Sequence, residues 1–286
     1  MKITDIIRAD KPSLSFEVFP PKTDSAFESV RSAAAEIAAL SPAYMSVTYG
    51  AGGSTAGYTA EIASSLLSLG VTPLAHLSCI GASRESIREK LADLRARGIE
   101  NVLALRGDLP EGVVPEHLTY RYASALATEI RDFGGFCIGG ACYPEKHPES
   151  ADSDADIEAL RIKVEAGCSF LTTQMFFDNN ILYNFLYRLL RRGIDVPVVA
   201  GVMPLTNAAQ IKRICAISGT ALPSRFLRIV ERYGDNPAAM KQAGIAFATE
   251  QIIDLYANGV TAVHVYSMNK PDVAATISRN LSEILA

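Results

Sequence analysis

Residues 136–176 read FCIGGACYPEKHPESADSDADIEALRIKVEAGCSFLTTQMF and contain the unit that decides the fold. Short apolar runs at both ends flank a segment in which Ile157, Leu160 and Val164 recur at helical spacing. That segment ends at Gly167, a residue suited to the left-handed conformation that closes many helices. A strand, a helix and a second strand in this order favour a parallel βαβ unit.

The same alternation continues along the chain on both sides of this unit. Eight runs have the length and apolar character of strands buried in a parallel sheet. They cover residues 14–19, 44–49, 72–79, 101–106, 136–143, 170–176, 197–203 and 262–268. The long gap between the last two runs has room for further helices at 207–217, 224–232 and 237–258.

Eight such units predict an α/β fold, a (β/α)8 TIM barrel with extra helices between strands seven and eight. An open, doubly wound sheet is the alternative, although its usual nucleotide-binding motifs, GxGxxG and GxxxxGK[ST], do not occur in the sequence. No linker, repeat or low-complexity stretch divides the chain. Residues 1–286 are therefore expected to form a single catalytic domain.

The composition excludes several classes of protein. The chain has 27 Lys+Arg, 31 Asp+Glu and a formal net charge of -4, and it has no basic block of the kind that binds nucleic acid. No apolar run is long enough to span a membrane, and the N-terminus lacks the apolar core of a signal peptide. The five cysteines are scattered, without CxxC spacing, which argues against disulfides and a metal site. We expect a cytoplasmic protein without a bound metal.

Polar side chains interrupt the apolar strands at or just beyond their carboxyl ends, where barrels place their active sites. Most of them, taken singly, have a structural explanation as hydrogen-bonded core residues. Glu17 differs, because a carboxylate in an apolar strand is costly unless it is neutral, paired or functional. Together these side chains predict a catalytic mouth; they are Glu17, Thr48, Tyr49, His76, Arg106, Asp108, Tyr143, His147, Gln174, Tyr266 and Asn269.

Eight short motifs, in order along nearly the whole chain, resemble those of the methylenetetrahydrofolate reductase family. They are FEVFPPK at 16–22, SVTYGA at 46–51, HLSCI at 76–80, LALRGDLP at 103–110, YPEKHPE at 143–149, TQMFFD at 173–178, GVMP at 201–204 and YSMN at 266–269. Each motif is modest alone, but eight of them in this order and spacing are specific.

The resemblance implies that the barrel holds FAD non-covalently and reduces 5,10-methylenetetrahydrofolate to 5-methyltetrahydrofolate. It implies NADH or NADPH as the hydride donor, in a ping-pong sequence. By position, Glu17 would be the general acid, and Asp108 would contact both flavin and folate. The residues implied around FAD are Thr48, Tyr49, Ala51, His76, Arg106, Gly107, Asp108, Tyr122, Ala123, Tyr143, His147, Asp156 and Lys163. Those implied on the substrate side are Gln174, Gln210 and Lys270.

The two carboxyl groups are expected to differ in protonation state. Burial in an apolar strand should keep Glu17 protonated near neutral pH, and Thr48 is expected to hydrogen-bond it. Asp108, close to Arg106 and to glycine N–H groups, should stay ionised and stabilise positive charge that develops on the substrate.

Two departures and two rival functions remain open at this stage. Better-known bacterial members of the family have an aromatic residue where Ile214 aligns and an arginine where Lys270 aligns, which bears on donor preference and folate affinity. One rival is a pterin-dependent methyltransferase barrel, which needs no hydride donor. The other is a flavin-binding subunit that receives electrons from a partner protein. The sequence also leaves a homo-oligomer open.

Overall fold

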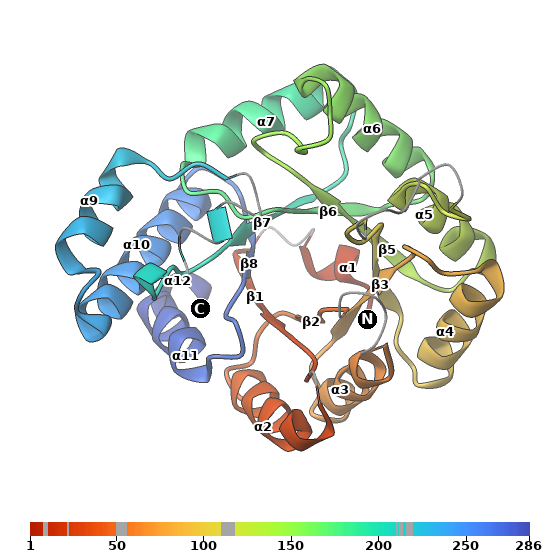
Figure 1. Ribbon diagram of the computed structural model, residues 1–286, viewed down its shortest axis with the longest axis horizontal. Helices are drawn as coiled ribbons and strands as arrows, with labels where there is room; N and C mark the ends of the chain where they lie inside the picture. Colours follow the sequence, from red (N-terminus) through yellow and green to blue (C-terminus); the bar gives the residue numbers. More distant parts are fainter. Residues whose placement is uncertain are drawn as a thin grey trace.

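The computed structural model describes residues 1–7, 11–21, 23–49, 56–109, 118–209, 211, 214–215 and 220–286. Within these residues, parallel strands in sequence order close into an eight-stranded barrel (Figure 1). The predicted TIM barrel is thereby confirmed, and the open sheet is excluded. The strands are β1 (Ser13–Val18), β2 (Met45–Val47), β3 (Pro73–Ser78), β4 (Asn101–Leu105), β5 (Cys137–Cys142), β6 (Phe170–Thr173), β7 (Val198–Val202) and β8 (Ala262–Val265).

Helices alternate with the strands and surround the barrel (Figure 1). Helices α9 and α10 lie between β7 and β8 and confirm the extra helices expected at 224–232 and 237–258; the segment 207–217 lies partly outside the described residues. The helices are α1 (Ile3–Ile7), α2 (Phe27–Ala38), α3 (Ala56–Ser68), α4 (Arg84–Ala96), α5 (Ala123–Phe133), α6 (Ser153–Glu165), α7 (Asn179–Arg191), α9 (Ser224–Tyr233), α10 (Pro237–Ala257), α11 (Pro271–Asn280) and α12 (Ser282–Leu285), with a 3-10 turn η1 (Asp24–Ala26) before α2.

The strands are shorter than the apolar runs suggested, mostly at their carboxyl ends. For example, β2 ends at Val47, so Thr48 and Tyr49 lie beyond it, and β6 ends at Thr173, just before Gln174. Apolar residues follow the last paired residue of several strands because the barrel mouth is still covered by helices. The polar residues of the predicted mouth therefore lie on the connecting loops as well as on the strands.

Local signals in the sequence explain the βαβ unit formed by β5, α6 and β6. The side chain of Asp152 accepts a hydrogen bond from the backbone N–H of Ala155 at 2.8 Å and so caps the first turn of α6. After the helix, Gly167 has φ +128°, where a side chain would be strained. A Cβ there would also lie 3.2 Å from Arg131. These two ends fix where α6 starts and stops.

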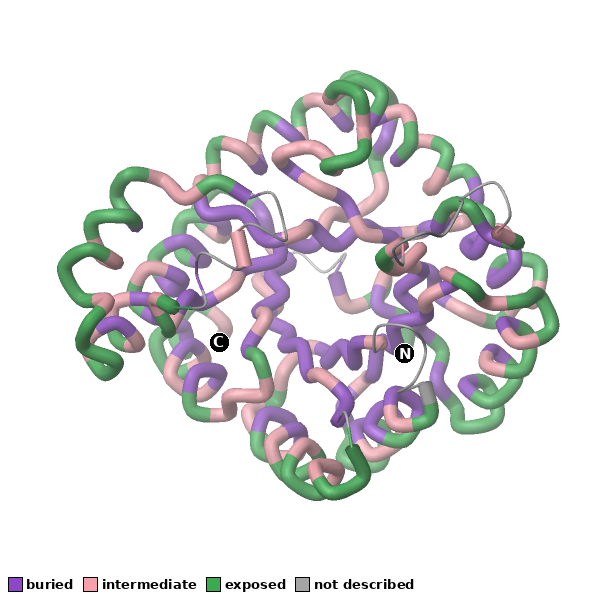
Figure 2. The backbone as a smooth tube through the Cα atoms, viewed as in Figure 1, coloured by how far each residue is buried: buried purple, intermediate pink, exposed green. Residues whose placement is uncertain are grey.

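The core has two main layers. The larger one lies between the strands and the surrounding helices, where buried residues gather on the inward faces (Figure 2). The second fills the barrel itself and includes Leu74, Leu103, Phe170 and Val199, with Ile3 of α1 packed against them. Helix α1 thus closes the amino-terminal end of the barrel. This end is apolar and filled, so a site can form only at the opposite, carboxyl end.

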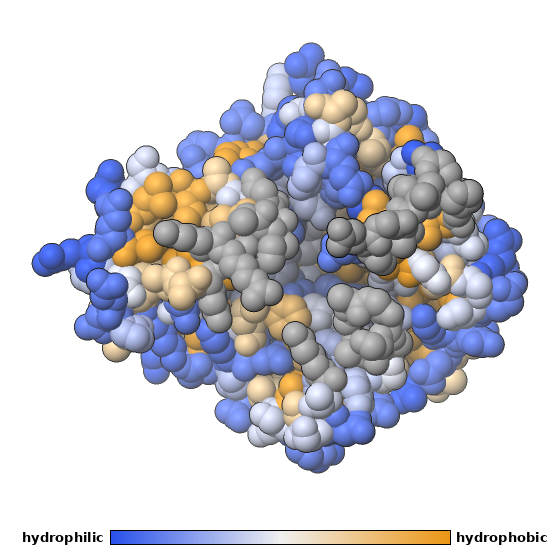
Figure 3. Space-filling view, viewed as in Figure 1, coloured by the Kyte–Doolittle hydropathy of each residue, from blue (hydrophilic) through white to orange (hydrophobic). Residues whose placement is uncertain are grey.

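A third cluster anchors the extra helices to the barrel mouth. Phe226 of α9 packs between Phe177, just after β6, and Phe247 of α10, with ring centroids 6.2 Å and 4.7 Å apart. Hydrophobic side chains also gather on the surface over α9 and α10 (Figure 3). The insertion therefore braces the segment that carries Gln174.

Asn269 ties the ends of β8 and β1 together beyond their last ladder bonds. Its Oδ1 accepts a hydrogen bond from the backbone N–H of Phe19 at 2.8 Å, and its Nδ2 donates to the carbonyl of Phe19 at 3.0 Å. Met268 and Asn269 have φ of +56° and +53°, a left-handed conformation that asparagine tolerates better than most residues. The Ser267 hydroxyl donates to the carbonyl of Glu17 at 3.0 Å. This seam fixes the backbone on both sides of Glu17.

Replacing Asn269 by Ala should lower the free energy of unfolding by about 2–4 kcal/mol, because two hydrogen bonds are lost and alanine is strained in the left-handed conformation. Asn269→Gly should lose only the hydrogen bonds, about 1–3 kcal/mol, since glycine adopts this conformation freely. Urea unfolding of the three proteins measures both differences. An alanine variant as stable as the wild type would contradict the account of the seam.

Candidate active site

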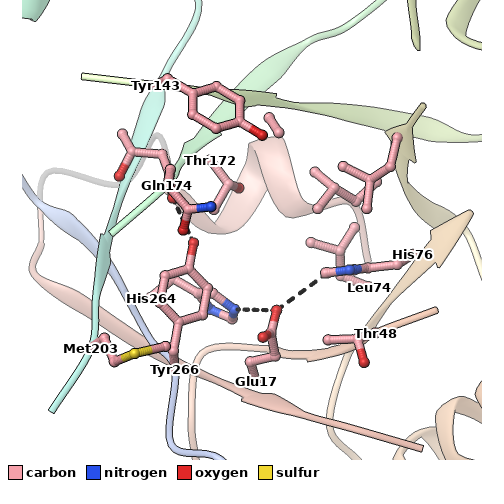
Figure 4. Close-up of a pocket in the computed structure, with 14 residues that line it drawn as sticks. Glu17, Thr48, Leu74, His76, Tyr143, Thr172, Gln174, Met203, His264 and Tyr266 are labelled. Atoms are coloured by element: carbon pink, nitrogen blue, oxygen red, sulfur yellow. Dashed lines mark hydrogen bonds and ion pairs between the residues drawn. The ribbon is translucent and has the colours of Figure 1, made fainter. Parts of the chain in front are cut away.

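The carboxyl half of the barrel interior is polar on one side, across four neighbouring strands. Side chains alternate inward and outward along each strand. In register, Ser15 of β1 lies beside His264 of β8, and Glu17 of β1 lies beside Ser46 of β2. His76 of β3 completes this side, with Leu74 of the same strand beside it (Figure 4); Leu103 and Leu105 of β4 also line the cavity. Glu17 thus lies on the floor of a cavity, with polar neighbours on both adjacent strands.

The Glu17 side chain is only 8% exposed and is held by neighbouring groups. The Ser46 hydroxyl donates to its Oε2 at 3.3 Å, and the Nε2 atoms of His76 and His264 lie 3.6 Å and 4.0 Å from the same oxygen. The expected hydrogen bond from Thr48 is therefore wrong. Thr48 lies past the end of β2, whereas Ser46 lies in register with Glu17 on the strand itself.

Burial decides the charge of this cluster. It raises the pKa of Glu17 to about 8, although the hydrogen bond from Ser46 acts in the opposite direction. Burial also lowers the pKa of His76 and of His264 to about 3, so both rings are neutral at physiological pH. A neutral carboxylic acid between neutral imidazoles is a group prepared to donate a proton rather than to bind a cation.

Glu17 should make the flavin-free protein less stable as the pH rises from about 5 to about 9. The pKa of Glu17 is about 8 in the folded protein and 4.5 as a model value, so the folded state keeps a proton that the unfolded chain has released. This contribution is complete below pH 4.5 and lost as the pH passes 8. At ~1.36 kcal/mol per pKa unit it amounts to about 3–5 kcal/mol.

Glu17→Gln should remove most of this loss, which urea unfolding at several pH values measures against the wild type. The two histidines do not interfere, because their lowered pKa values cost stability only as the pH falls below about 6.5. Parallel alkaline curves for the two proteins would show that the Glu17 carboxyl titrates normally.

A second, larger cavity opens beside the central one. It has a volume of about 540 Å³ and lies between α6, the start of α5 and the loops after β4 and β5. The central cavity, of about 260 Å³, shares Ala141 and Tyr143 with it. The two cavities therefore adjoin each other between Glu17 and α6, and together they are called the groove below. Seven residues that the resemblance associates with FAD line the outer part: Arg106, Tyr122, Ala123, Tyr143, His147, Asp156 and Lys163.

Lys163 is the strongest sign that the outer groove accepts an anion. Its ammonium group is buried, which lowers its pKa, and it donates to the carbonyl of Ala141. Among the ion pairs of the described residues, none includes Lys163. Gly140 leaves room for its stem, since a Cβ there would lie 2.7 Å from the Cδ of Lys163. A buried cation without a direct ion pair favours a ligand that brings an anion, although the charge of Asp156 also acts on Lys163.

Comparison with known proteins shows the family. A profile of the methylenetetrahydrofolate reductase family matches residues 2–282. The 5,10-methylenetetrahydrofolate reductase of Pectobacterium carotovorum subsp. carotovorum is 34% identical over 271 residues, which are 94% of this chain and 90% of that protein. The chain belongs to the methylenetetrahydrofolate reductase family. The expectation of an enzyme from an oxidoreductase family is thereby confirmed.

Other relatives of this methylenetetrahydrofolate reductase family member differ in length. The 5,10-methylenetetrahydrofolate reductase of Escherichia coli (strain K12) is 32% identical over 270 residues, which are 94% of this chain and 90% of that protein. Methylenetetrahydrofolate reductase (NADH) 1 of Arabidopsis thaliana is 35% identical over 300 residues, 99% of this chain but 50% of that protein. The chain thus spans about half the length of the plant relatives and nine-tenths of the bacterial ones.

Solved structures add a likeness of fold. An uncharacterized protein from Clostridium thermocellum, described as binding two copies of 5-methyl-5,6,7,8-tetrahydrofolic acid, matches with a TM-score of 0.67 at 12% identity over 99% of this chain and all of that one. A tryptophan synthase structure from M. tuberculosis matches with a TM-score of 0.55 at 12% identity, over 99% of this chain and 96% of that one. At this identity the likeness concerns the barrel alone.

In this member of the family, the surroundings of Asp108 differ from those predicted, because its expected neighbour Arg106 pairs with another carboxylate. Asp108 is exposed after Gly107, whose φ of +88° turns the chain beyond β4. Arg106 donates two hydrogen bonds of 2.6 Å to the carboxylate of Glu149. The expected local partner of Asp108 is thus engaged by Glu149, and Asp108 acts on Arg106 only through its charge.

The remaining predicted residues do not all meet in one place. Gln174 lines the central cavity with Thr48 and His76, while His76 also borders a third cavity, of about 280 Å³, with Tyr49. Lys270 lies elsewhere and donates to the Thr206 hydroxyl at 3.0 Å. Ile214 packs, partly buried, against the cluster under α9 and α10. The predictions for Ala51 and Gln210 lie outside the described residues.

Three residues of the site were not recognised from the sequence: Ser15, Ser46 and His264. The signal for His264 was present, because a histidine inside the apolar run AVHV is as unusual as a glutamate inside LSFEVF. Ser15 lies two residues before Glu17 and therefore faces the same side of β1. Ser46 could be placed only through the register between β1 and β2.

Two further observations concern the part of the chain that the structure describes. No helix there is both long and apolar enough to cross a membrane. Over the same residues, no group of three or more His, Cys, Asp or Glu side chains could hold a metal ion.

Proposed function

We propose that the chain reduces 5,10-methylenetetrahydrofolate to 5-methyltetrahydrofolate, with FAD bound in the groove and NADH or NADPH as the donor. The observation that carries this proposal is the buried Glu17, protonated near neutral pH, on the floor of a groove that leads to the buried Lys163. The named activity of the bacterial relatives supports the same reaction.

Two cations in the wall of the outer cavity, and its position beside the cavity that holds Glu17, support a flavin dinucleotide as the ligand. Bound FAD would supply the hydride chemistry that amino-acid side chains lack. Lys163 and Arg106 would hold its diphosphate, because they are the cations that line the outer cavity. Tyr122 and Ile162, which are 53% and 47% exposed, would be covered by the nucleotide. The isoalloxazine ring would reach the central cavity past Tyr143, which borders both parts.

Glu17 acts as the general acid in this proposal. Opening the five-membered ring of the substrate requires a proton on the departing nitrogen, and Glu17 is the protonated acid of the central cavity. The carboxylate of Asp108 would stabilise the cationic carbon that ring opening exposes. Gln174 would contact the folate and the nicotinamide alternately, which gives ping-pong kinetics; Gln210 and Lys270 would contribute on the folate side.

The comparisons bear on the substrate and the donor. The solved structure described as binding 5-methyl-5,6,7,8-tetrahydrofolic acid supports a folate at the mouth of this barrel. Plant relatives carry NADH in their names, which supports a nicotinamide donor over a partner protein. We further propose a single catalytic domain that works in the cytoplasm.

The test is the visible absorption spectrum of the purified protein under anaerobic conditions, before and after the addition of NADH and then NADPH. The proposal predicts flavin absorption that bleaches with at least one donor. Flavin absorption that persists with both would favour the partner-dependent subunit instead. A protein that takes up no flavin even with added FAD would favour the methyltransferase.

A further inference from the structure

A continuous chain of hydrogen bonds runs through the barrel interior behind Glu17. The Ser15 hydroxyl lies 2.7 Å from Nδ1 of His264, and Nε2 of His264 lies 2.9 Å from the Ser46 hydroxyl. Ser46 in turn lies 3.3 Å from Oε2 of Glu17. All four side chains are buried, and all come from the adjacent strands β8, β1 and β2.

The chain can run in two directions, because each hydroxyl has one proton and a neutral imidazole has one N–H. In the first, Ser15 donates to Nδ1, Nε2–H donates to Ser46, and Ser46 donates to Oε2 of Glu17. In the second, Nδ1–H donates to Ser15, which donates to the carbonyl of Val263 at 3.0 Å, and Ser46 donates to Nε2. Burial lowers the pKa of His264 to about 3, which excludes a doubly protonated ring at neutral pH.

The two directions treat Glu17 differently. In the second, Ser46 has no proton left for Glu17, so Oε2 must carry the carboxyl proton itself, and an ionised Glu17 loses its donor. In the first, Oε2 always accepts, so the proton of the neutral acid lies on Oε1. Only the first direction suits both the neutral and the ionised carboxyl without a change of tautomer. A general acid passes through both states in each turnover.

We propose that His264 is a positioning residue, held as the Nε2–H tautomer by Ser15, which through Ser46 keeps the transferable proton of Glu17 on Oε1. This inference rests on the proposed function for its catalytic consequence, but not for the tautomer. His264 never touches the substrate. It sets which oxygen of the acid is free to donate, and it stabilises the carboxylate after the proton has left.

Two aromatic rings hold the imidazole in the plane that this relay requires. Tyr44 stacks on His264 with ring centroids 5.4 Å apart and planes 6° apart, and Tyr266 meets it edge-on at 5.5 Å and 89°. Another titratable group close to Glu17 is His76 on β3, which is neutral. The charge of Glu17 acts on Tyr44 and Tyr266, whose pKa values burial raises further above neutrality. Among these groups, only Glu17 titrates near pH 8.

The direct test is 15N NMR of the purified protein labelled at its histidine ring nitrogens. The chain has four histidines, so the signals of His264 are identified by their loss in His264→Gln. We expect a protonated Nε2 and an unprotonated Nδ1 from pH 6 to pH 9.5. A protonated Nδ1 at either end of this range would overturn the proposal. This reading does not depend on any activity, so it stands or fails separately from the reductase assignment.

The kinetic test compares His264→Gln with His264→Leu in the reduction of methylenetetrahydrofolate by the reduced enzyme. Glutamine can still donate to Ser46 and should retain the rate within about threefold. Leucine fills the space but cannot donate, so the rate should fall by about 10- to 100-fold, and the alkaline limb of the pH profile should move upward. Flavin bleaching by the nicotinamide donor should be unchanged in both.

Val265→Ala on β8 is the control for packing, since Val265 is fully buried and lies outside the relay. It should lose stability without moving the pH profile. Equal losses of rate in the glutamine and leucine variants, with an unmoved pH profile, would assign His264 a purely structural role and overturn the proposal.

Discussion

Glu17→Gln is expected to abolish the reduction of methylenetetrahydrofolate while flavin bleaching by the nicotinamide donor continues at nearly the wild-type rate. The amide keeps the size of the side chain and can keep the hydrogen bond with Ser46, but it has no proton to give. Loss of a general acid typically costs 10²- to 10⁴-fold. The bleaching reaction needs no proton from Glu17, so the two half-reactions separate the role of the acid from the integrity of the site.

Stopped-flow absorbance measures both half-reactions on one preparation. Glu36→Gln, on the exposed face of α2, makes the same chemical change away from the groove and should leave both rates unchanged. Unfolding does not explain a loss in Glu17→Gln, because that variant is expected to be the more stable protein at alkaline pH. If folate reduction survived in Glu17→Gln, another group would have to be the acid.

Lys163→Met is expected to weaken FAD binding by about 10²- to 10³-fold. Truncating one member of a buried charge pair commonly costs ~2–5 kcal/mol, and the diphosphate would be left without its buried cation. Methionine keeps most of the stem that packs beside Gly140, so the groove should stay open. Quenching of flavin fluorescence on titration with the flavin-free protein measures the dissociation constant.

Lys241→Met is the matched control, because Lys241 forms an exposed ion pair with Asp272 away from the groove. It should bind FAD as tightly as the wild type. Equal affinities of Lys163→Met and Lys241→Met for FAD would mean that the outer groove does not hold the diphosphate.

The sequence predicts the barrel well because its signals are local and repeated. Each apolar run and each helical segment can be recognised by itself. Eight strands that alternate with helices are the pattern of a TIM barrel. The ends of the strands were less predictable. Buried apolar residues such as Met175 and Phe176 continue past the end of β6 at Thr173, and hydrophobicity does not distinguish a strand from a buried loop.

The site could be predicted one residue at a time, but not as a network. Glu17 stands out because a carboxylate in a buried strand has few structural explanations. The neighbours of Glu17 are set by the register between strands that are distant in the sequence. Ser46 is about 30 residues from Glu17, and His264 is about 250 residues from Ser15. The sequence therefore suggested Thr48 as the partner of Glu17, where the register places Ser46.

The ion pair between Arg106 and Glu149 could not be predicted for the same reason: the two residues are distant in the sequence. Both residues lie in recognised motifs, yet nothing in either motif says that the loops after β4 and β5 meet across the groove. Lys163 was expected near FAD from the resemblance alone. The structure adds the physical reason, a buried ammonium group on the wall of a cavity.

The central claim is that this groove brings a reduced flavin and a folate together over a protonated Glu17. It is tested most directly by mixing the anaerobically reduced protein with 5,10-methylenetetrahydrofolate. We predict that the flavin absorption returns in step with the appearance of 5-methyltetrahydrofolate, one molecule per flavin, and that Glu17→Gln shows neither change. A reduced flavin that stays bleached in the wild-type protein while the folate remains unchanged would contradict the account.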